Sequence, residues 1–376
     1  MAETTRARVL QVLGSSAGGV ARHVAQISRA LGAGVEPGER CQVHVAGPTS
    51  VRGVVAAEGS GTGFTAVEIS DRPGPGDARS ARTLRRLARG ADVVHAHGLR
   101  AGALVVVATR GLRGRPRVVV TLHNLPVGSR RVRAVSSVLE RLVSRHADAV
   151  LGVSTDLVEL ARRRGASRTA RALVPAPPRP EVVRSPAQVR ASLDIPADAR
   201  LLVTVGRLAP QKGLDTLCEA AAILAATTTP GSLVWAVAGD GPLREQLQSR
   251  IDADDLPVLL LGYREDAPDL MSAADVVVST AVWEGQPIWL QEALGLGAAI
   301  VATDAGGTRE VTGGAAVLVA VGDATALARG IDELLSDATR RGALKESARA
   351  RAATLPSAID VVGSLTELYR SLRLGR

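Results

Sequence analysis

The chain has 376 residues, of which 46% are hydrophobic, and arginine supplies 44 of its 46 basic side chains. Only six residues are aromatic, so no stacking platform for single-stranded nucleic acid is present, and no helix-turn-helix or zinc-finger pattern occurs. The longest uncharged apolar stretch, residues 101–109, is far shorter than the about 20 residues of a membrane-spanning helix. We therefore expect a protein that binds no nucleic acid and does not cross a membrane.

The positive charge is concentrated in the first half of the chain. Residues 1–180 hold 28 arginines against 12 acidic residues, so they carry +16, whereas residues 181–376 carry −7. This asymmetry favours an anionic or lipid-linked partner, or peripheral attachment at the inner face of a membrane. The polar start MAETTRAR and the widely separated Cys41 and Cys218 predict a reduced, cytoplasmic protein. The sequence leaves the oligomeric state open.

Short Val- and Leu-rich runs alternate with helical segments from end to end. In the first half they cover residues 8–14, 41–47, 92–98, 117–124 and 148–154; in the second half they cover 200–206, 233–241, 257–263, 275–280, 298–304 and 315–320. Continuous apolar strands separated by helices are typical of parallel sheets with helices on both faces. The fold class is therefore α/β, with two doubly wound, Rossmann-like domains.

A linker separates the two sets of strands. Residues 174–186 contain five prolines, which cannot continue a helix or a central strand. We expect a first domain over residues 1–178 and a second over 179–355. Residues 356–376 would form an amphipathic helix that packs back towards the first domain.

The loops of the first half contain glycines and histidines. Gly18 and Gly19 open a helix after the first strand, so their amides could face an anion, although a tight turn alone would explain them equally. The turn lacks the G-x-G-x-x-G spacing of dinucleotide sites, which disfavours a dehydrogenase. His95 and His97 alternate at a strand end, but without further ligands we expect core or loop histidines and no metal site. Residues 130–149 are basic and amphipathic, which favours a packed helix with an arginine-rich outer face over membrane docking.

Polar residues follow two strands of the second half. Arg207 and Lys212 share one loop, where two cations could hold a departing diphosphate, although such a pair is often simply solvated. Glu284 and Glu292 flank Pro287, and proline suits a first helical turn. The helix is therefore expected from about 287 to 294, with Glu284 before it and Glu292 inside it.

These residues carry a resemblance to the retaining nucleotide-sugar glycosyltransferases of family 4, which have the GT-B fold. The second half resembles them through GRLAPQKGLD, AGDGPLRE and the long stretch from LMSAADVVVST to GGTREV, and the first half through SAGGVARHV, DVVHAHG, TLHN and ADAVLGVSTDLVEL. The most specific part is the ordered set Arg207, Lys212, Glu284 and Glu292. The resemblance implies two domains facing across a cleft and metal-independent hexosyl transfer with retention, in a bacterial enzyme that needs no cofactor.

The resemblance also implies roles for individual residues. Arg207 and Lys212 would bind the donor diphosphate together with the amides of Gly18 and Gly19, and the expected nucleotide is UDP or GDP. Glu284 would contact the donor sugar and Glu292 the ribose. The catalytic group would comprise Arg207, Lys212, Glu284 and His123. Further donor contacts would come from Tyr263, Arg264, Gly285, Gln286, Pro287 and Ile288, and the acceptor side would include Arg22, His23, His97 and His123.

Two departures from the family pattern concern the donor pocket and the linker. Gln286 stands where the family has an aromatic or aliphatic residue, next to an additional Trp283, and VPAPPRP replaces the usual segment after the first domain. Alternatives remain open at this point: a nucleotide-sugar epimerase or hydrolase of the same fold, or a non-catalytic sugar-nucleotide-binding partner. The sugar, the base, the acceptor and the linkage are not defined by the sequence.

Overall fold

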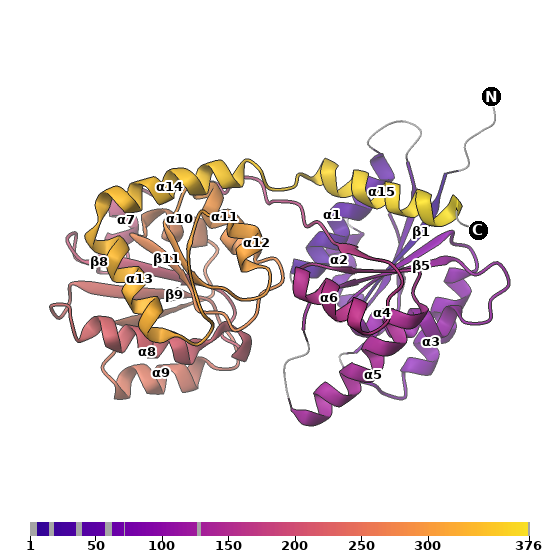
Figure 1. Cartoon of the computed structure of the whole chain (residues 1–376), viewed down its shortest axis with the longest axis horizontal. Coiled ribbons are helices and arrows are strands. Elements are labelled where there is room, and N and C mark those ends of the chain that lie inside the picture. Colours follow the sequence, from indigo (N-terminus) through magenta and orange to yellow (C-terminus); the bar gives the residue numbers. More distant parts are fainter. Residues whose placement is uncertain are drawn as a thin grey trace. The chain divides into compact units, whose positions relative to one another are not determined.

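The computed structural model describes residues 6–14, 19–34, 40–56, 62–70, 72–125 and 129–374. The chain forms two compact units. Unit 1 comprises Met1–Pro175 together with Pro356–Arg376, and unit 2 comprises Ala176–Leu355 (Figure 1). Each unit has its own parallel sheet with helices on both faces, as the strand pattern predicts.

The sheet of unit 1 has seven parallel strands in the order β3-β2-β1-β4-β5-β6-β7. They are β1 (Arg8–Leu13), β2 (Gln42–Gly47), β3 (Gly63–Ala66), β4 (Val93–His97), β5 (Arg117–Leu122), β6 (Ala149–Gly152) and β7 (Thr169–Arg171). The prediction of five strands was wrong by two, since it omitted β3 and β7. Both are short edge strands that are only partly buried, so they lack the continuous apolar run of a central strand.

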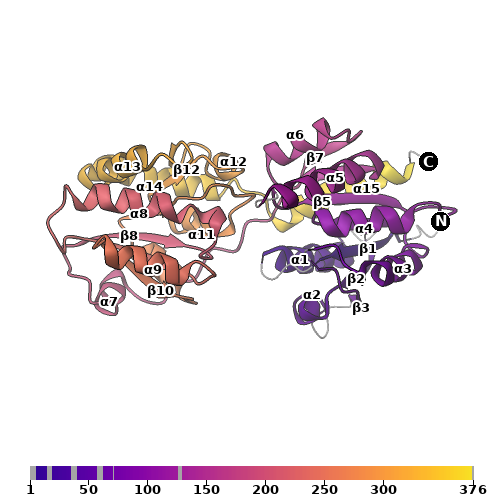
Figure 2. The ribbon, with the colours of Figure 1, turned by 90° about the horizontal axis from the view of Figure 1, so that it is seen from below.

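Helices cover both faces of this sheet. The helices α1 (Gly19–Ala33) and α15 (Ala358–Leu374) lie on one face, and α3 (Asp77–Ala88), α4 (Leu99–Thr109) and α5 (Arg130–His146) lie on the other (Figures 1 and 2). The remaining helices are η1 (Thr49–Val51), α2 (Arg52–Val55) and α6 (Thr155–Arg163). The last helix, α15, belongs to unit 1, where Tyr369 Oη lies 2.6 Å from His95 Nδ1 of β4.

The helix α5 packs in unit 1 as its amphipathic pattern predicts, but only over its second half. Only Glu140, Val143 and Ser144 are buried, and Val132, Val135 and Val138 are exposed. A 17-residue helix is about 26 Å long, whereas six residues of a strand span about 20 Å, so the first turns of α5 extend beyond the sheet. None of the described helices has the length and apolar character to cross a membrane.

The sheet of unit 2 has six parallel strands in the order β10-β9-β8-β11-β12-β13, and all six were predicted. They are β8 (Arg200–Val205), β9 (Leu233–Ala238), β10 (Val258–Gly262), β11 (Val276–Ser279), β12 (Ile300–Thr303) and β13 (Val317–Val319). Side chains alternate between two cores: Leu202 packs with α8 (Leu214–Ala225), α9 (Arg244–Ala253) and α13 (Ala324–Ser336). Leu201 and Val203 face the opposite core, with α7 (Pro186–Ala191), α10 (Ala267–Ala273), α11 (Ile288–Leu296) and α14 (Ala338–Ala352).

The proline-rich segment contains neither helix nor strand from residue 172 to 185. The helix α7 then begins at Pro186, and Ser185 and Gln188 form a capping box at its start. Two short helices, η2 (Pro210–Lys212) and α12 (Thr308–Thr312), lie in loops of unit 2.

Candidate functional site

The strand order of unit 2 reverses between β8 and β11. The connections after these neighbouring strands lead away in opposite directions, which leaves a crevice at the carboxyl ends of the strands where ligands bind in such sheets. Arg207 and Lys212 follow β8, and Glu284 follows β11. Lys212 Nζ lies 2.5 Å from Glu284 Oε1, and Val282 N donates to Gln211 O at 2.9 Å. The structure therefore brings together Lys212 and Glu284, which are 72 positions apart in the sequence.

Backbone geometry fixes the position of Lys212. Gly213 has a φ of +61° at the start of α8, and a Cβ there would lie 2.0 Å from the carbonyl oxygen of Thr280. Thr280 Oγ1 donates to the carbonyl oxygen of Lys212 at 2.7 Å. The Lys212 side chain is 18% exposed and that of Glu284 is 13% exposed. A loop that only glycine can close thus holds an ammonium group against a largely buried carboxylate.

Arg207 differs from Lys212 because its side chain is exposed. No ion-pair partner for it occurs within the described part of the chain. It lines a small pocket together with Gly206, Lys212, Thr280 and Trp289. Its guanidinium is therefore free to bind an anion that enters beside Lys212.

The loop after β11 leads into α11, which begins at Ile288 and so matches the predicted helix start. The carbonyl oxygen of Glu284 accepts a hydrogen bond from Gly307 N at 2.8 Å, which anchors the loop to the segment after β12. Gly285, Gln286 and Pro287 lead directly into the helix, and Glu292 is half-buried in its second turn. The first amides of α11 thus lie beside the Lys212–Glu284 pair.

Two buried polar atoms of residues 286–289 have no hydrogen-bond partner among the described residues. They are Gln286 Oε1 and Trp289 Nε1, an acceptor and a donor. A buried polar atom left unpaired costs about 1–3 kcal/mol, so both atoms are suited to a bound polar ligand. Trp289 was not among the site residues predicted from the sequence, although its indole N–H is a hydrogen-bond donor.

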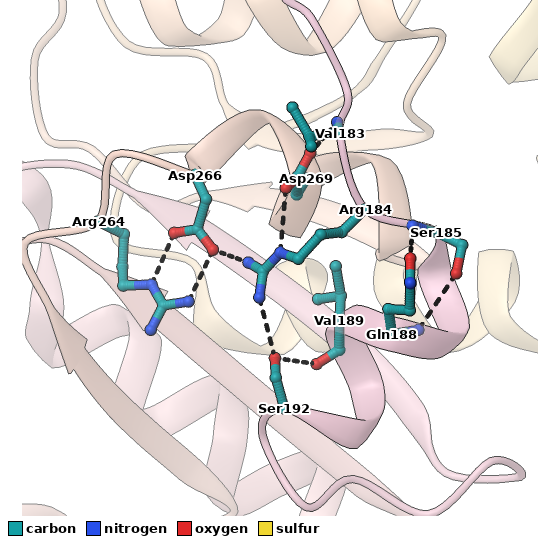
Figure 3. Close-up of polar contacts among 9 residues, drawn as sticks. All are labelled: Val183, Arg184, Ser185, Gln188, Val189, Ser192, Arg264, Asp266 and Asp269. Carbon is teal, nitrogen blue, oxygen red and sulfur yellow. Dashed lines mark hydrogen bonds and ion pairs between the residues drawn. The ribbon is translucent and has the colours of Figure 1, made fainter.

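The loop after β10 is held by a network of charged side chains (Figure 3). Tyr263 is 74% exposed at this loop, and the guanidinium of Arg264 binds both oxygens of Asp266 at 2.7 Å. Asp266 also pairs with Arg184 from the proline-rich segment. The predicted pair Tyr263 and Arg264 therefore lies directly after β10, the edge strand next to β9, in a loop with two arginine–aspartate ion pairs.

Arg184 connects this loop to two further elements (Figure 3). Its Nε donates to Asp269 Oδ2 of α10 at 3.2 Å, and its Nη1 donates to Ser192 Oγ at 3.3 Å. Burial raises the pKa of Asp269, but hydrogen bonds from Val183 N and Arg184 outweigh this and hold it below its usual value. The roles of Arg184, Asp266 and Asp269 were not predicted, since their spacing in the sequence gives no sign that they meet.

The predicted acceptor-side histidines gather in unit 1. His23 lies on α1, His97 ends β4 and His123 follows β5; the His23 ring centroid lies 6.1 Å from that of His97 and 5.8 Å from that of His123. Burial lowers the pKa of His23 to about 4. Burial and the neighbouring imidazoles hold the pKa values of His97 and His123 well below the ordinary value. At neutral pH these imidazoles are therefore uncharged.

The other predicted residues of unit 1 lie nearby on α1 or outside the described chain. Gly19 is the first residue of α1, and Arg22 is exposed on its first turn. Gly18 lies outside the described residues. Across the described ranges, no group of three or more His, Cys, Asp or Glu side chains is arranged to hold a metal ion.

Comparison with known families gives two matches that together cover most of the chain. Residues 18–177 match the family described as glycosyl transferase 4-like domain, and residues 187–351 match glycosyl transferases group 1. The two matches coincide closely with units 1 and 2.

Several curated proteins are similar over part of their length. A lipopolysaccharide core biosynthesis glycosyltransferase, LpsE, of Rhizobium meliloti is 33% identical over 42% of this chain and 46% of its own. The UDP-Gal:alpha-D-GlcNAc-diphosphoundecaprenol alpha-1,3-galactosyltransferase of Escherichia coli is 27% identical over 57% of this chain and 58% of its own. The chain thus matches about half the length of these relatives.

Solved structures share the fold over nearly the whole chain. Anabaena Alr3699/HepE, solved in complex with UDP-glucose, has a TM-score of 0.77 at 21% identity and covers 97% of this chain and 99% of its own. Sucrose-phosphate synthase from Thermosynechococcus elongatus has a TM-score of 0.75 at 21% identity, over 99% of this chain and 100% of its own.

Proposed function

Because this chain belongs to the family 4 glycosyltransferases with the GT-B fold, we propose that it transfers a hexose from a nucleoside-diphosphate sugar to an acceptor. The observation that carries the proposal is the pairing of Lys212 with Glu284 beside the exposed Arg207, at the strand reversal of unit 2. Two cations at one crevice can neutralise a diphosphate as it leaves the sugar.

The donor would be held by residues of unit 2. Arg207 and Lys212 would bind the diphosphate, with the first amides of α11 adding hydrogen bonds. Glu284 would contact the sugar. Gln286 Oε1 would accept from a sugar hydroxyl, and Trp289 Nε1 would donate to a sugar hydroxyl or a phosphate oxygen. Glu292 would bind the ribose, and the loop of Tyr263 and Arg264 the base. UDP and GDP are the expected nucleotides.

We propose that transfer proceeds with retention at the anomeric carbon and without a metal ion. Arg207 and Lys212 supply the positive charge that the leaving diphosphate needs, so the step requires no bound cation. The bond between the anomeric carbon and the diphosphate would break, and the acceptor oxygen would bond to the same face of the sugar. The acceptor proton would pass to the departing phosphate oxygen, while His123 would lie near the acceptor.

The acceptor would be anionic or lipid-linked, in keeping with the net charge of +16 on residues 1–180. The Escherichia coli relative is named for an acceptor of this kind, a diphosphoundecaprenol. The exposed valines of α5 lie beside the exposed Arg130, Arg131 and Arg133, a combination that suits the surface of an anionic membrane. The protein would then act in the cytoplasm, at the inner face of the membrane.

A donor panel tests the proposal. Purified protein is mixed with UDP-, GDP-, ADP- and TDP-sugars, with and without lipid-linked and soluble acceptors, and release of the nucleoside diphosphate is measured. We expect release that depends on an acceptor, together with a product whose anomeric configuration matches the donor by NMR. Donor turnover without acceptor would favour a hydrolase or an epimerase, and donor binding without turnover a non-catalytic partner.

A further inference from the structure

A layer of polar side chains lies inside unit 1, on the sheet face that α1 and α15 cover. The parallel register places Gln11 beside His95 and His97 beside Thr121, so these four side chains point to the same face. Each of them is at most 1% exposed. Polar groups at this depth need hydrogen-bond partners, because an unpaired one costs about 1–3 kcal/mol.

Two chains of hydrogen bonds run through the layer. In the first, His95 lies between Tyr369 Oη, 2.6 Å from its Nδ1, and Thr121 Oγ1, 2.7 Å from its Nε2. In the second, His97 lies between Gln11 and His123. Its Nε2 is 2.8 Å from Gln11 Oε1, and its Nδ1 is 3.2 Å from His123 Nε2.

The second chain has a direction because one end can only accept. The amide oxygen of Gln11 has no hydrogen to give, so His97 Nε2 must carry the hydrogen. An uncharged imidazole has one N–H, which leaves His97 Nδ1 with an unshared electron pair. That pair accepts from His123 Nε2, which must carry the hydrogen of His123. The Nδ1 atom of His123 then carries no hydrogen, and we call such a ring nitrogen bare.

We propose that Gln11 and His97 are positioning residues that fix His123 as the tautomer with a bare Nδ1, so that His123 recognises a substrate hydroxyl and not a phosphate oxygen. A bare ring nitrogen accepts from a hydroxyl but has no hydrogen to donate to a phosphate. The inference deepens the proposed function and rests on it for the placement of His123 near the substrates. Either the donor sugar or the acceptor can supply the hydroxyl.

The tautomers of His97 and His123 can be measured by NMR without an assay of enzymatic activity. All six histidines lie within the first 146 residues, so a protein labelled with nitrogen-15 at histidine gives a short spectrum that single substitutions can assign. Protonated and bare ring nitrogens resonate in separate regions. We expect the hydrogen on Nε2 of both His97 and His123 at neutral pH. A hydrogen on Nδ1 of His123 would overturn the proposal.

Substitution of Gln11 tests whether this residue, through His97, determines the tautomer of His123. A carboxylate in Gln11→Glu would hold His97 as an imidazolium, whose Nδ1–H would donate to His123 Nε2 and move the hydrogen of His123 to Nδ1. We expect this inverted tautomer and about a tenfold or greater fall in kcat/KM, the loss of one hydrogen bond to substrate. If a buried carboxylate prevents folding, Gln11→Met removes the acceptor instead and should give mixed tautomers at His97 and His123. An unchanged His123 spectrum in the variants that fold would contradict the proposal.

Thr121→Val is the matched control. It removes a hydrogen bond from His95 in the same buried layer but leaves Gln11, His97 and His123 in place. We expect the tautomer of His123 and turnover to stay as in the wild type. A rise in KM for the donor or for the acceptor in the Gln11 variants identifies which substrate supplies the hydroxyl. If His97 and His123 show the expected tautomers but the protein transfers no sugar, the result would contradict the proposed function and not the tautomer assignment.

Discussion

Lys212 Nζ lies 2.5 Å from Glu284 Oε1, although the two residues are 72 positions apart and both side chains are largely buried. We expect Lys212→Ala to lower kcat/KM for transfer by about a hundredfold or more, because the leaving diphosphate loses a cation. The same change leaves the Glu284 carboxylate unpaired, so the melting temperature should fall as well. Initial rates and thermal unfolding measure the two effects.

A second variant separates these two effects of Lys212. In Lys212→Met combined with Glu284→Gln, no unpaired charge remains, so the melting temperature should recover while transfer stays impaired. Recovery of both stability and transfer in the double variant would show that Lys212 serves only the fold.

Arg207 offers a test without this complication. Its side chain is exposed, so Arg207→Ala should change the free energy of unfolding by less than about 0.5 kcal/mol. We nevertheless expect kcat/KM to fall by at least about tenfold, since the diphosphate loses a guanidinium. Arg200 is the matched control, because it is exposed at the other end of the same strand, β8. Equal activity of the Arg207→Ala and Arg200→Ala variants would remove Arg207 from the site.

The network around Asp266 predicts a link between the proline-rich segment and nucleotide affinity. Arg184→Met should remove the link between the proline-rich segment and Asp266 and so loosen the loop of Tyr263 and Arg264, which would weaken binding of UDP or GDP by about tenfold, or 1.4 kcal/mol. Isothermal titration calorimetry measures the affinity. Arg190→Met is the control, because Arg190 forms a somewhat more buried pair with Asp275, at 2.9 Å, that does not involve this loop. Equal losses in both variants would indicate a general loss of stability.

The exposed valines of α5 predict binding to anionic membranes. We expect the protein to sediment with vesicles that contain anionic lipid, less so at high salt, and Val138→Asp to reduce this binding. Val107→Asp is the control, since Val107 is 53% exposed on a different helix, α4. Unchanged sedimentation of the Val138→Asp variant would exclude α5 as the contact.

Much of this architecture could be predicted from sequence because central parallel strands are apolar throughout. Residues 200–206 and 275–280 illustrate this, as each contains an uninterrupted buried run. The edge strands β3 and β7 were missed since partly exposed strands carry no such pattern. The start of α11 was found through Pro287, a residue with a local conformational preference.

Only part of the candidate site could be predicted from the sequence, for a related reason. Arg207, Lys212 and Glu284 follow strands directly, so their placement follows from the topology. Gln11 and Arg184 do not: Gln11 lies within an apolar strand and Arg184 within a proline-rich segment, and their roles depend on partners that only the tertiary structure supplies. No local pattern marks such contacts.

The buried histidines predict that unit 1 unfolds in mild acid before unit 2. His23 has a pKa of about 4 when folded and an ordinary value of 6.5, so the unfolded state binds more protons and stability falls as the pH drops from about 6.5 towards 4. At pH 5 this one residue lowers the free energy of unfolding by about 2 kcal/mol, and His95, with a pKa of about 3, adds to the effect.

Unit 2 contains no histidine but all three tryptophans. In urea at pH 5, circular dichroism should therefore detect a transition that precedes the change in tryptophan fluorescence, whereas at pH 7.5 the two should lie closer together. His23→Gln should reduce this pH dependence, and His146→Gln should not, because His146 is exposed. Transitions whose separation is the same at both pH values would show that the imidazoles do not limit the stability of unit 1.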